Sequence, residues 1–183
     1  MIARVLAGDS TAFEPLVLPY RQILFGLAYK MTGNREDALE VSQETLLRAF
    51  RYLSRCDLER SFRNWLMQIL VNAARDFGGK QSREAARRDG DSFLENVLSG
   101  EPRPEDSRER SEIRGRVREA MSVLSGRERE IFILRDLEEK SISETAEITK
   151  SSAISVRVHL SRARAKLRKY LAGDNRGPEE TVR

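Results

Sequence analysis

Apolar residues recur every three or four positions along most of the chain. This spacing is typical of helices that bury one face. In the first half it predicts helices over about residues 12–31, 35–53 and 61–77, with Gly33 ending the first and the Gly78-Gly79 pair interrupting the third. In the second half it predicts helices over about residues 113–124, 126–137, 142–148 and 153–171. The predicted fold class is therefore all-α.

Polar side chains stand where several of these helices should begin. Three Ser or Thr residues precede a glutamate by three positions, which is the spacing of a capping box. These pairs are Thr11 with Glu14, Ser125 with Glu128, and Ser141 with Glu144. Asn34 is expected to cap the second helix. Near the end of the chain, a short helix, the turn Thr149–Ser152 and a longer basic helix form a helix-turn-helix pattern.

The composition changes between the two groups of helices. Residues 91–112 carry three Lys or Arg against seven Asp or Glu, two close-set prolines and few apolar side chains. Such a segment cannot support a core, so we interpret residues 89–112 as a flexible acidic linker. We expect two small helical domains, at residues 1–88 and 113–173, the second ending in the helix-turn-helix, and a flexible tail at residues 174–183.

The composition also limits the kinds of chemistry that the chain can perform. Its single cysteine, Cys56, excludes an internal disulfide, and its single histidine, His159, excludes a site built on a histidine pair. No nucleophile, glycine-rich phosphate loop or ligand cluster accompanies the carboxylates. We expect no enzyme activity, no bound metal and no cofactor. The absence of a membrane span or signal pattern predicts a cytoplasmic protein.

Arginine dominates the positive charge. Of the 33 basic residues 27 are Arg, and the net charge is +4. The planar guanidinium fork matches phosphate oxygens and the edge of guanine better than an ammonium does. This composition suggests a polyanionic partner, although a GC-rich genome also produces arginine-rich proteins.

The last predicted helix carries the strongest functional signal. From Lys150 to Lys169 there are seven Lys or Arg residues and no acid. In a helix-turn-helix, residues near the start of the second helix reach base edges in the major groove, and later basic residues hold the backbone. The candidate DNA contacts are Ser155, Arg157, Val158, Ser161, Arg162, Arg164, Lys166 and Arg168. The alternative is that this helix is only a solvated basic face.

Two further segments are candidates for contact with partners. Aromatic side chains around Phe62 and Trp65 lie near Arg63 and Arg75, a combination that suits stacking on unpaired bases, although the apolar stripe that contains Trp65 by itself favours packing in the core. The second predicted helix has a polar and acidic face that repels DNA and therefore faces solvent or a basic protein. That face carries Asp37, Glu40, Gln43 and Glu44, with Leu47 nearby.

Six segments, taken in order, carry a specific resemblance. They are AFEPLVLPY (12–20), TGNREDALEVSQETLLRAF (32–50), SFRNWLMQILVNAARD (61–76), LSGRERE (124–130), SISETAEI (141–148) and VRVHLSRARAKLRKYL (156–171). Their order and spacing resemble bacterial RNA polymerase sigma factors of the extracytoplasmic-function type, in both region two and region four. The chain departs from the family pattern at Gly78-Gly79, Thr145 and Ile154.

The resemblance implies a protein that binds core RNA polymerase and directs it to promoter DNA. In region two, the acidic face from Asp37 to Leu47 is implied to bind the polymerase. The following segment is implied to open the minus 10 element and to hold its bases; its candidates are Phe62, Arg63, Asn64, Trp65 and Arg75. Region four is implied to place the last helix in the minus 35 element. The resemblance further implies control by an anti-sigma factor, and we expect neither membrane insertion nor a small-molecule substrate.

Two other classes of function remain open at this point. An autonomous helix-turn-helix regulator would bind specific duplex DNA tightly without polymerase. A helical adaptor that binds only proteins would be insensitive to changes at Arg157 and Arg162.

Overall fold

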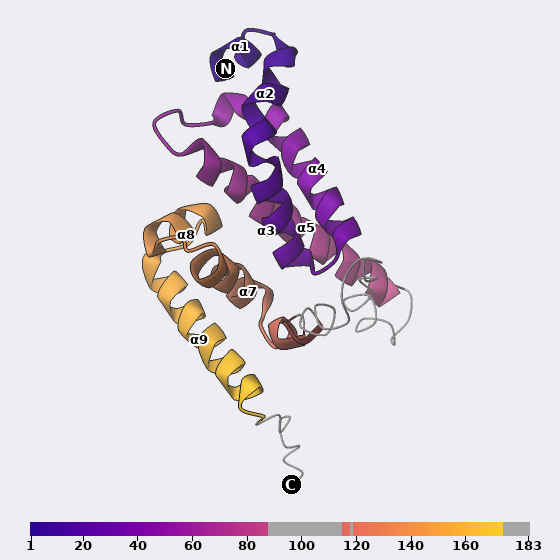
Figure 1. Cartoon of the computed structure of the whole chain (residues 1–183), viewed down its shortest axis with the longest axis vertical. Helices are drawn as coiled ribbons and strands as arrows, with labels where there is room; N and C mark the ends of the chain where they lie inside the picture. The colour runs from indigo at the N-terminus through magenta and orange to yellow at the C-terminus, as the bar shows by residue number, and fades with distance from the viewer. Residues whose placement is uncertain (88–114, 118, 174–183) are drawn as a thin grey trace.

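The structure is a computed structural model that describes residues 1–87, 115–117 and 119–173. These residues form helices joined by turns, with no strand among them, which confirms the all-α fold class (Figure 1). The segment interpreted as a linker, residues 89–112, and the tail at 174–183 lie outside the described residues. Two groups of helices are visible, one before and one after this linker segment.

The N-terminal half is built around three long helices. Its elements are α1 (Ile2–Leu6), η1 (Ser10–Ala12), α2 (Phe13–Val17), η2 (Leu18–Tyr20), α3 (Arg21–Thr32), α4 (Arg35–Arg51), η3 (Leu53–Arg55) and α5 (Phe62–Arg87). Helices α3, α4 and α5 each pack against the other two. Gly33 ends α3 with a positive φ of 84°, and the Asn34 side chain accepts the backbone N–H of Asp37 at 2.8 Å. Both of these helix boundaries agree with the sequence prediction.

The first predicted helix is divided in the structure. Residues 12–31 form the end of η1, α2, η2 and most of α3 instead of one helix. Pro19 lies in η2, because proline has no N–H to continue an α-helical hydrogen-bond ladder. The predicted capping box of Thr11 and Glu14 was also wrong. Asp9 accepts the Thr11 backbone N–H at 3.2 Å instead, and α2 begins without a side-chain cap.

Helix α5 continues through the Gly78-Gly79 pair, so the predicted interruption was wrong. Each helical glycine costs about 1 kcal/mol relative to alanine, which is a local penalty and does not forbid the helix. The preceding residues bury a long apolar face against the bundle, including Leu70 and Val71, which are fully buried. Beyond the glycines, the Gln81 amide donates to Asp37 of α4 at 3.2 Å. Contacts on both sides of the pair therefore hold the helix together.

The C-terminal half contains the helix-turn-helix. Its elements are α7 (Gly126–Phe132), the π-helical segment η4 (Ile133–Leu137), α8 (Ile142–Thr149) and α9 (Ala153–Leu171), preceded by helical residues at 115–117 and 119–122. Both predicted capping boxes in this half are present, Ser125 with Glu128 and Ser141 with Glu144. Lys150, in the turn, takes the left-handed conformation that ends α8 without a glycine.

The two halves share one hydrophobic core, a contact that the sequence did not predict. Side chains from α5 meet side chains from η4 and α8, and all six are fully buried. These residues are Leu66, Met67, Leu70, Ile133, Leu134 and Ile148. A smaller cluster of Ile131, Val156 and Leu160 joins α7 to α9. The C-terminal half is consequently packed directly against α5 (Figure 1).

Two kinds of site are missing from the part of the chain that the structure describes. No helix there combines the length and the apolar character that crossing a membrane requires. No three His, Cys, Asp or Glu side chains there are grouped so that they could hold a metal ion.

Candidate nucleic-acid and protein interfaces

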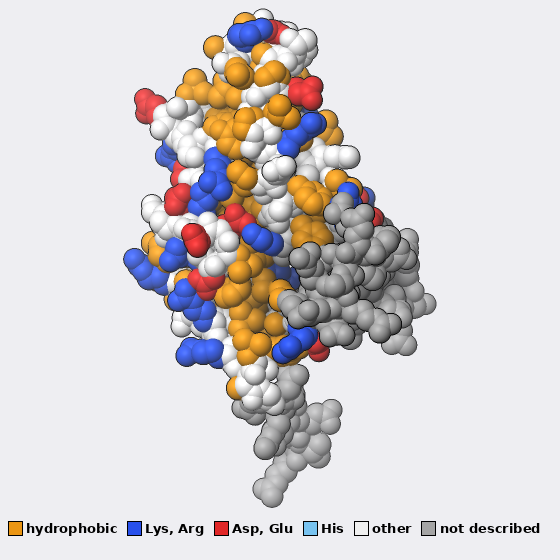
Figure 2. All heavy atoms as spheres, in the orientation of Figure 1, with side chains coloured by type: hydrophobic (Ala, Val, Ile, Leu, Met, Phe, Trp, Pro, Cys, Tyr) orange, Lys and Arg blue, Asp and Glu red, His pale blue; other side chains and the backbone are white. Residues whose placement is uncertain are grey.

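Helix α9 is held by its inner face and presents its outer face to solvent. Val156, Leu160 and Ala163 are buried against the rest of the half. The Ser152 hydroxyl caps the start of α9 by accepting the backbone N–H of Ser155 at 3.1 Å. Because the buried residues recur at helical spacing, the opposite side of α9 is exposed along its length. Figure 2 shows Lys and Arg side chains gathered along the outer edge of this helix.

The sequence-predicted contacts on α9 are mostly on its accessible side. Seven of the eight are exposed and one, Ser155, is half-buried. The exposed residues are Arg157, Val158, Ser161, Arg162, Arg164, Lys166 and Arg168. This arrangement brings the predicted set together on one continuous surface.

The cations of α9 differ in what they contact. The Arg164 guanidinium donates two hydrogen bonds to Asp136, at 2.9 and 2.6 Å, and the Asp136 carboxylate raises the pKa of Arg164. Lys166 donates to Glu128 at 2.7 Å. Within the described part of the chain, Arg157 and Arg162 take part in no ion pair. Among the described residues, no carboxylate therefore competes for the Arg157 and Arg162 guanidinium groups.

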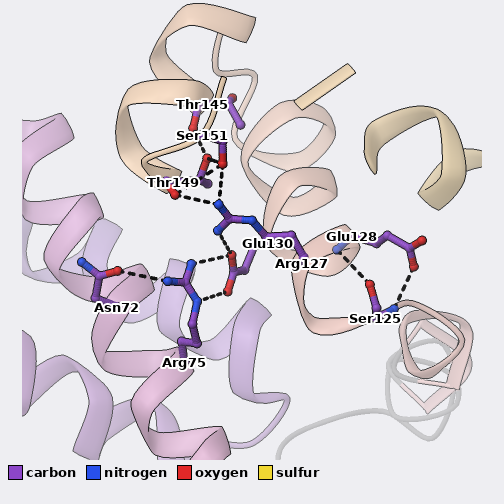
Figure 3. A network of polar contacts seen from close by, with 9 residues as sticks. All are labelled: Asn72, Arg75, Ser125, Arg127, Glu128, Glu130, Thr145, Thr149 and Ser151. Carbon is purple, nitrogen blue, oxygen red and sulfur yellow. Dashed lines mark hydrogen bonds and ion pairs between the residues drawn. The ribbon is translucent and has the colours of Figure 1, made fainter. Parts of the chain in front are cut away.

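A guanidinium anchors the turn that precedes α9. Arg127 of α7 donates to the Thr149 carbonyl at 2.8 Å and also to the Ser151 hydroxyl (Figure 3). The same side chain pairs with Glu130 at 2.8 Å. Since α9 starts directly after this turn, Arg127 fixes the angle at which the helix leaves α8. Sequence spacing gave no signal for this anchor, because Thr149 and Ser151 lie 22 and 24 positions away from Arg127.

The candidate residues on α5 face the C-terminal half. The Arg75 guanidinium donates to both oxygens of Glu130, at 3.0 and 2.9 Å (Figure 3). Asn64 is only 6% exposed, and its side-chain oxygen accepts a hydrogen bond from Lys140 at 3.1 Å. Lys140 is itself 7% exposed and also pairs with Glu144. The polar side chains proposed to meet bases are thus partly occupied by contacts within the protein.

The aromatic candidates are packed together near the start of α5. Phe62 stacks on Trp65 with ring centroids 5.5 Å apart and meets Tyr20 edge to face at 5.6 Å. Phe62, Arg63 and Trp65 are all half-buried. The core-packing alternative therefore accounts for part of the Trp65 surface.

A cavity of about 360 Å³ lies between α5 and α8. Trp65 and Asn64 line it from the N-terminal half, and Glu147 and Lys150 line it from the C-terminal half. The Gln68 amide crosses beside it to donate to the Glu147 carbonyl at 2.9 Å. The cavity therefore exists only while the two halves are in contact.

The partner contacts predicted on α4 fall into two groups. Glu40, Gln43 and Leu47 are exposed on one line at helical spacing, and Leu47 is 59% exposed. In contrast, Asp37 accepts the side-chain amide of Asn34 at 2.7 Å, and Glu44 pairs with Arg48 at 2.6 Å. The first group is available to a partner, whereas the second stabilises α4 and its contact with α5.

Comparison with known families agrees with this geometry. The family model for sigma-70 region 2 matches residues 16–84, and the model for sigma-70 region 4 matches residues 114–167. Together the two models cover about two thirds of the 183 residues. The chain belongs to the sigma-70 family. The first match contains α3, α4 and most of α5, and the second contains α8 and most of α9.

Curated relatives of this sigma factor include proteins named as the predicted type. It is 28% identical to the extracytoplasmic-function sigma factor SigW of Bacillus subtilis, over 93% of this chain and 94% of that protein. It is also 28% identical to the RNA polymerase sigma-H factor of Pseudomonas aeruginosa, over 93% of this chain and 92% of that protein. The predicted extracytoplasmic-function type is confirmed.

Solved structures show the same fold as this sigma factor. The structure of CnrH in complex with the cytosolic domain of CnrY has a TM-score of 0.68 at 25% identity, and the match covers 94% of this chain and 96% of that chain. The sigma factor RpoE of Bartonella quintana, in complex with the anti-sigma factor NepR, has a TM-score of 0.71 at 23% identity over 89% of this chain and 98% of that one. The second likeness concerns the fold alone.

Proposed function

We propose that this sigma factor binds core RNA polymerase and directs it to promoters with a minus 10 and a minus 35 element. In this proposal residues 1–88 bind polymerase and open the minus 10 element, and residues 113–173 read the minus 35 element. The observation that carries the proposal is the matched order of the two sigma regions together with the capped, outward-facing basic helix α9. The polymerase supplies the catalysis, so the sigma factor itself needs no enzyme activity.

The minus 35 assignment rests on α9. Its inner face is fixed by buried apolar residues, and its turn is anchored by Arg127. Arg157 extends from the exposed side near the start of the helix, where a recognition helix reaches base edges, and Arg162 extends from its middle. Arg164, Lys166 and Arg168 follow toward its end, where phosphate contacts hold the duplex. Exposed ion pairs such as Arg164 with Asp136 contribute only about 0 to 1 kcal/mol, so phosphate can replace the carboxylate.

The polymerase assignment rests on α4. Glu40, Gln43 and Leu47 combine negative charge with an exposed apolar side chain on one face. A basic, partly apolar helical surface on the polymerase is the complementary partner. DNA is a poor alternative, because the carboxylates would repel its phosphates.

The minus 10 assignment requires a change in the contact between the halves. Asn64 is buried beneath Lys140, and Arg75 is bound to Glu130. Flipped bases can reach these side chains only after α7 and the segment that carries Lys140 have moved away from α5. We therefore propose that the two halves separate when the sigma factor joins polymerase and promoter.

We also propose a cytoplasmic location and an anti-sigma factor as the controlling partner. The location follows from the partners, since promoter DNA and polymerase share that compartment in bacteria. Support for a controlling protein partner comes from the similar protein CnrH, whose solved structure is a complex with the cytosolic domain of CnrY. Such a partner would act by covering the exposed face of α4 or by holding the two halves together.

Transcription from a pool of genomic fragments tests the proposed function. Purified core polymerase is supplied with or without the full-length chain, and transcript start sites are mapped. New, discrete start sites that depend on the protein are expected. Specific duplex binding by the protein alone, without new starts and without affinity for core polymerase, would instead establish an autonomous regulator. Polymerase binding without any promoter selection would establish a protein-binding adaptor.

A further inference from the structure

The centre of the exposed face of α9 is apolar. Ile154 and Val158 lie one helical turn apart on this face, and they are 73% and 41% exposed. Ser161 and Ala165, both small and exposed, continue the same line toward the end of the helix. The three apolar members of this line, Ile154, Val158 and Ala165, are what we call the apolar ridge, and the polar Ser161 lies between them. The ridge lies opposite the buried residues Val156, Leu160 and Ala163.

Helix formation does not explain the two large members of the apolar ridge. Ile and Val are β-branched and are less favourable in helices than alanine or leucine. Neither side chain packs into a core cluster, since the cluster beneath α9 is formed by Ile131, Val156 and Leu160. Exposed apolar side chains aligned on one face are typical of a contact surface for a partner.

The flanks of the apolar ridge identify the chemistry of that partner. Arg157 is exposed on one side of it and Arg162 on the other. Negative charge must therefore lie on both sides of an apolar strip, as it does where two phosphate backbones border a major groove. Within that groove the main apolar group on a base edge is the C5-methyl of thymine.

We propose that Ile154 and Val158 read thymine by contact with C5-methyl groups in the minus 35 element. This inference rests on the proposed function, because it assigns a base preference to the helix proposed to enter that element. Four residues of α-helix span about 6 Å, and neighbouring bases on one strand are about 3.4 Å apart. The two side chains therefore address methyl groups within about two base pairs of each other. Arg157 and Arg162 hold the flanking backbone or adjacent base edges.

Replacement of thymine by deoxyuridine tests the contact directly. Deoxyuridine keeps the pairing with adenine and removes only the methyl group. Holoenzyme is assembled from the full chain and core polymerase, and its affinity is measured for a promoter on which it starts transcription. Each thymine of the minus 35 element, on either strand, is replaced singly. We expect replacement at one or two positions to weaken binding about fourfold each, the value for loss of one buried methyl-sized group.

Variants of the protein assign the methyl contacts to individual side chains. Ile154→Ala and Val158→Ala should each weaken binding to the thymine promoter, and each should abolish the effect of deoxyuridine at one position. The matched control is Leu171→Ala, which removes an equally exposed aliphatic side chain, 72% exposed, from the other end of α9. This control variant should keep full sensitivity to deoxyuridine. Because both ridge positions are exposed, the alanine variants should keep the thermal stability of the parent.

Three results would overturn the inference while leaving the sigma function intact. The holoenzyme could respond equally to thymine and deoxyuridine at every position, or its minus 35 element could contain no thymine where α9 binds. Alternatively, Ile154→Ala could weaken assembly with core polymerase in the absence of DNA, which would make the apolar ridge a protein-docking surface. Failure of the sigma function itself is a different result, namely no promoter-specific transcription by the unmodified protein.

Discussion

Neighbouring arginines on α9 are distinguished by their partners more than by their exposure. Arg164 is held by two hydrogen bonds to Asp136, whereas Arg162, two positions earlier, takes part in no ion pair among the described residues. The sequence placed both in one basic set, because the Asp136 partner is 28 positions away from Arg164 and no local pattern links them. Their contributions to DNA binding should therefore differ.

Arg162→Ala should weaken promoter binding by the holoenzyme by about 1 to 3 kcal/mol, the usual value for loss of a guanidinium that contacts a base edge. Arg164→Ala should weaken it by less, because this side chain must exchange one anionic partner for another. Titration of a labelled promoter at fixed salt measures both. A larger effect at Arg164 than at Arg162 would contradict this ranking of the two side chains.

Glu144 gives the helix-turn-helix a specific sensitivity to acid. The backbone N–H of Ser141 and then the ammonium of Lys140 lower the pKa of Glu144 to about 2 from an ordinary value of 4.5. Since the pKa is lower in the folded state, the stability that Glu144 contributes is complete above pH 4.5 and is lost as the pH falls toward about 2. Chemical denaturation across this range should show a declining free energy of unfolding.

The variant Glu144→Gln separates the charge from the cap. Glutamine at this position still completes a capping box, so the start of α8 should persist. Its free energy of unfolding should be lower than that of the parent at neutral pH and should depend less on pH between 4.5 and about 2. An unchanged acid dependence would assign the sensitivity to other carboxylates.

Individual elements were the best-predicted level of the structure. The polar caps Asn34, Ser125 and Ser141 act within three residues of themselves, so their effect is visible in the sequence. The errors arose where a longer-range contact outweighed local propensity. The helix through Gly78-Gly79 is an example, because its continuation depends on packing against α4. For the candidate sites, the sequence predicted sets on α4 and α9 whose members are mostly exposed in the structure, but it did not show which side chains were already paired.

A charge change among the exposed α4 residues Glu40, Gln43 and Leu47 should affect binding to polymerase. Glu40→Lys should weaken assembly with core polymerase, and the effect should exceed tenfold if the residue meets a basic surface, since like charges at an interface cost several kcal/mol. The protein fold should be unaffected, because Glu40 is exposed. Competition for a limiting amount of core polymerase measures the change. The matched control is Glu14→Lys, an exposed acid on α2 outside this face.

At the scale of the whole molecule, the contact between the halves decides which surfaces are accessible. It combines the apolar core around Leu66 and Ile148 with polar contacts such as Lys30 with Glu138 at 2.6 Å. The polar pairs that meet here are 55 to 108 positions apart in sequence, so helical periodicity carried no information about them. In this arrangement α9 and the exposed line of α4 stay open, while Asn64 on α5 is covered.

Charge reversal at Glu130 should loosen this arrangement. Glu130 is paired with both Arg75 and Arg127, so Glu130→Lys would place three cations together between the halves. We expect a larger radius of gyration by small-angle X-ray scattering. We also expect the holoenzyme to produce more transcript from templates that carry the minus 10 element. The control Asp136→Lys breaks a pair confined to the C-terminal half, with Arg164. If both variants scatter like the parent, the apolar contact alone keeps the halves together.

The anchoring of the turn before α9 by Arg127 defines the smallest unit that can be exchanged between sigma factors. Transplanting α9 alone would transfer the side chains that meet DNA but not the guanidinium and the Ser151 hydroxyl that set its exit angle. A chimaera that carries residues 125–171 would preserve both. Engineering of promoter choice in this family should therefore begin the graft at the cap of α7 and not at the start of α9.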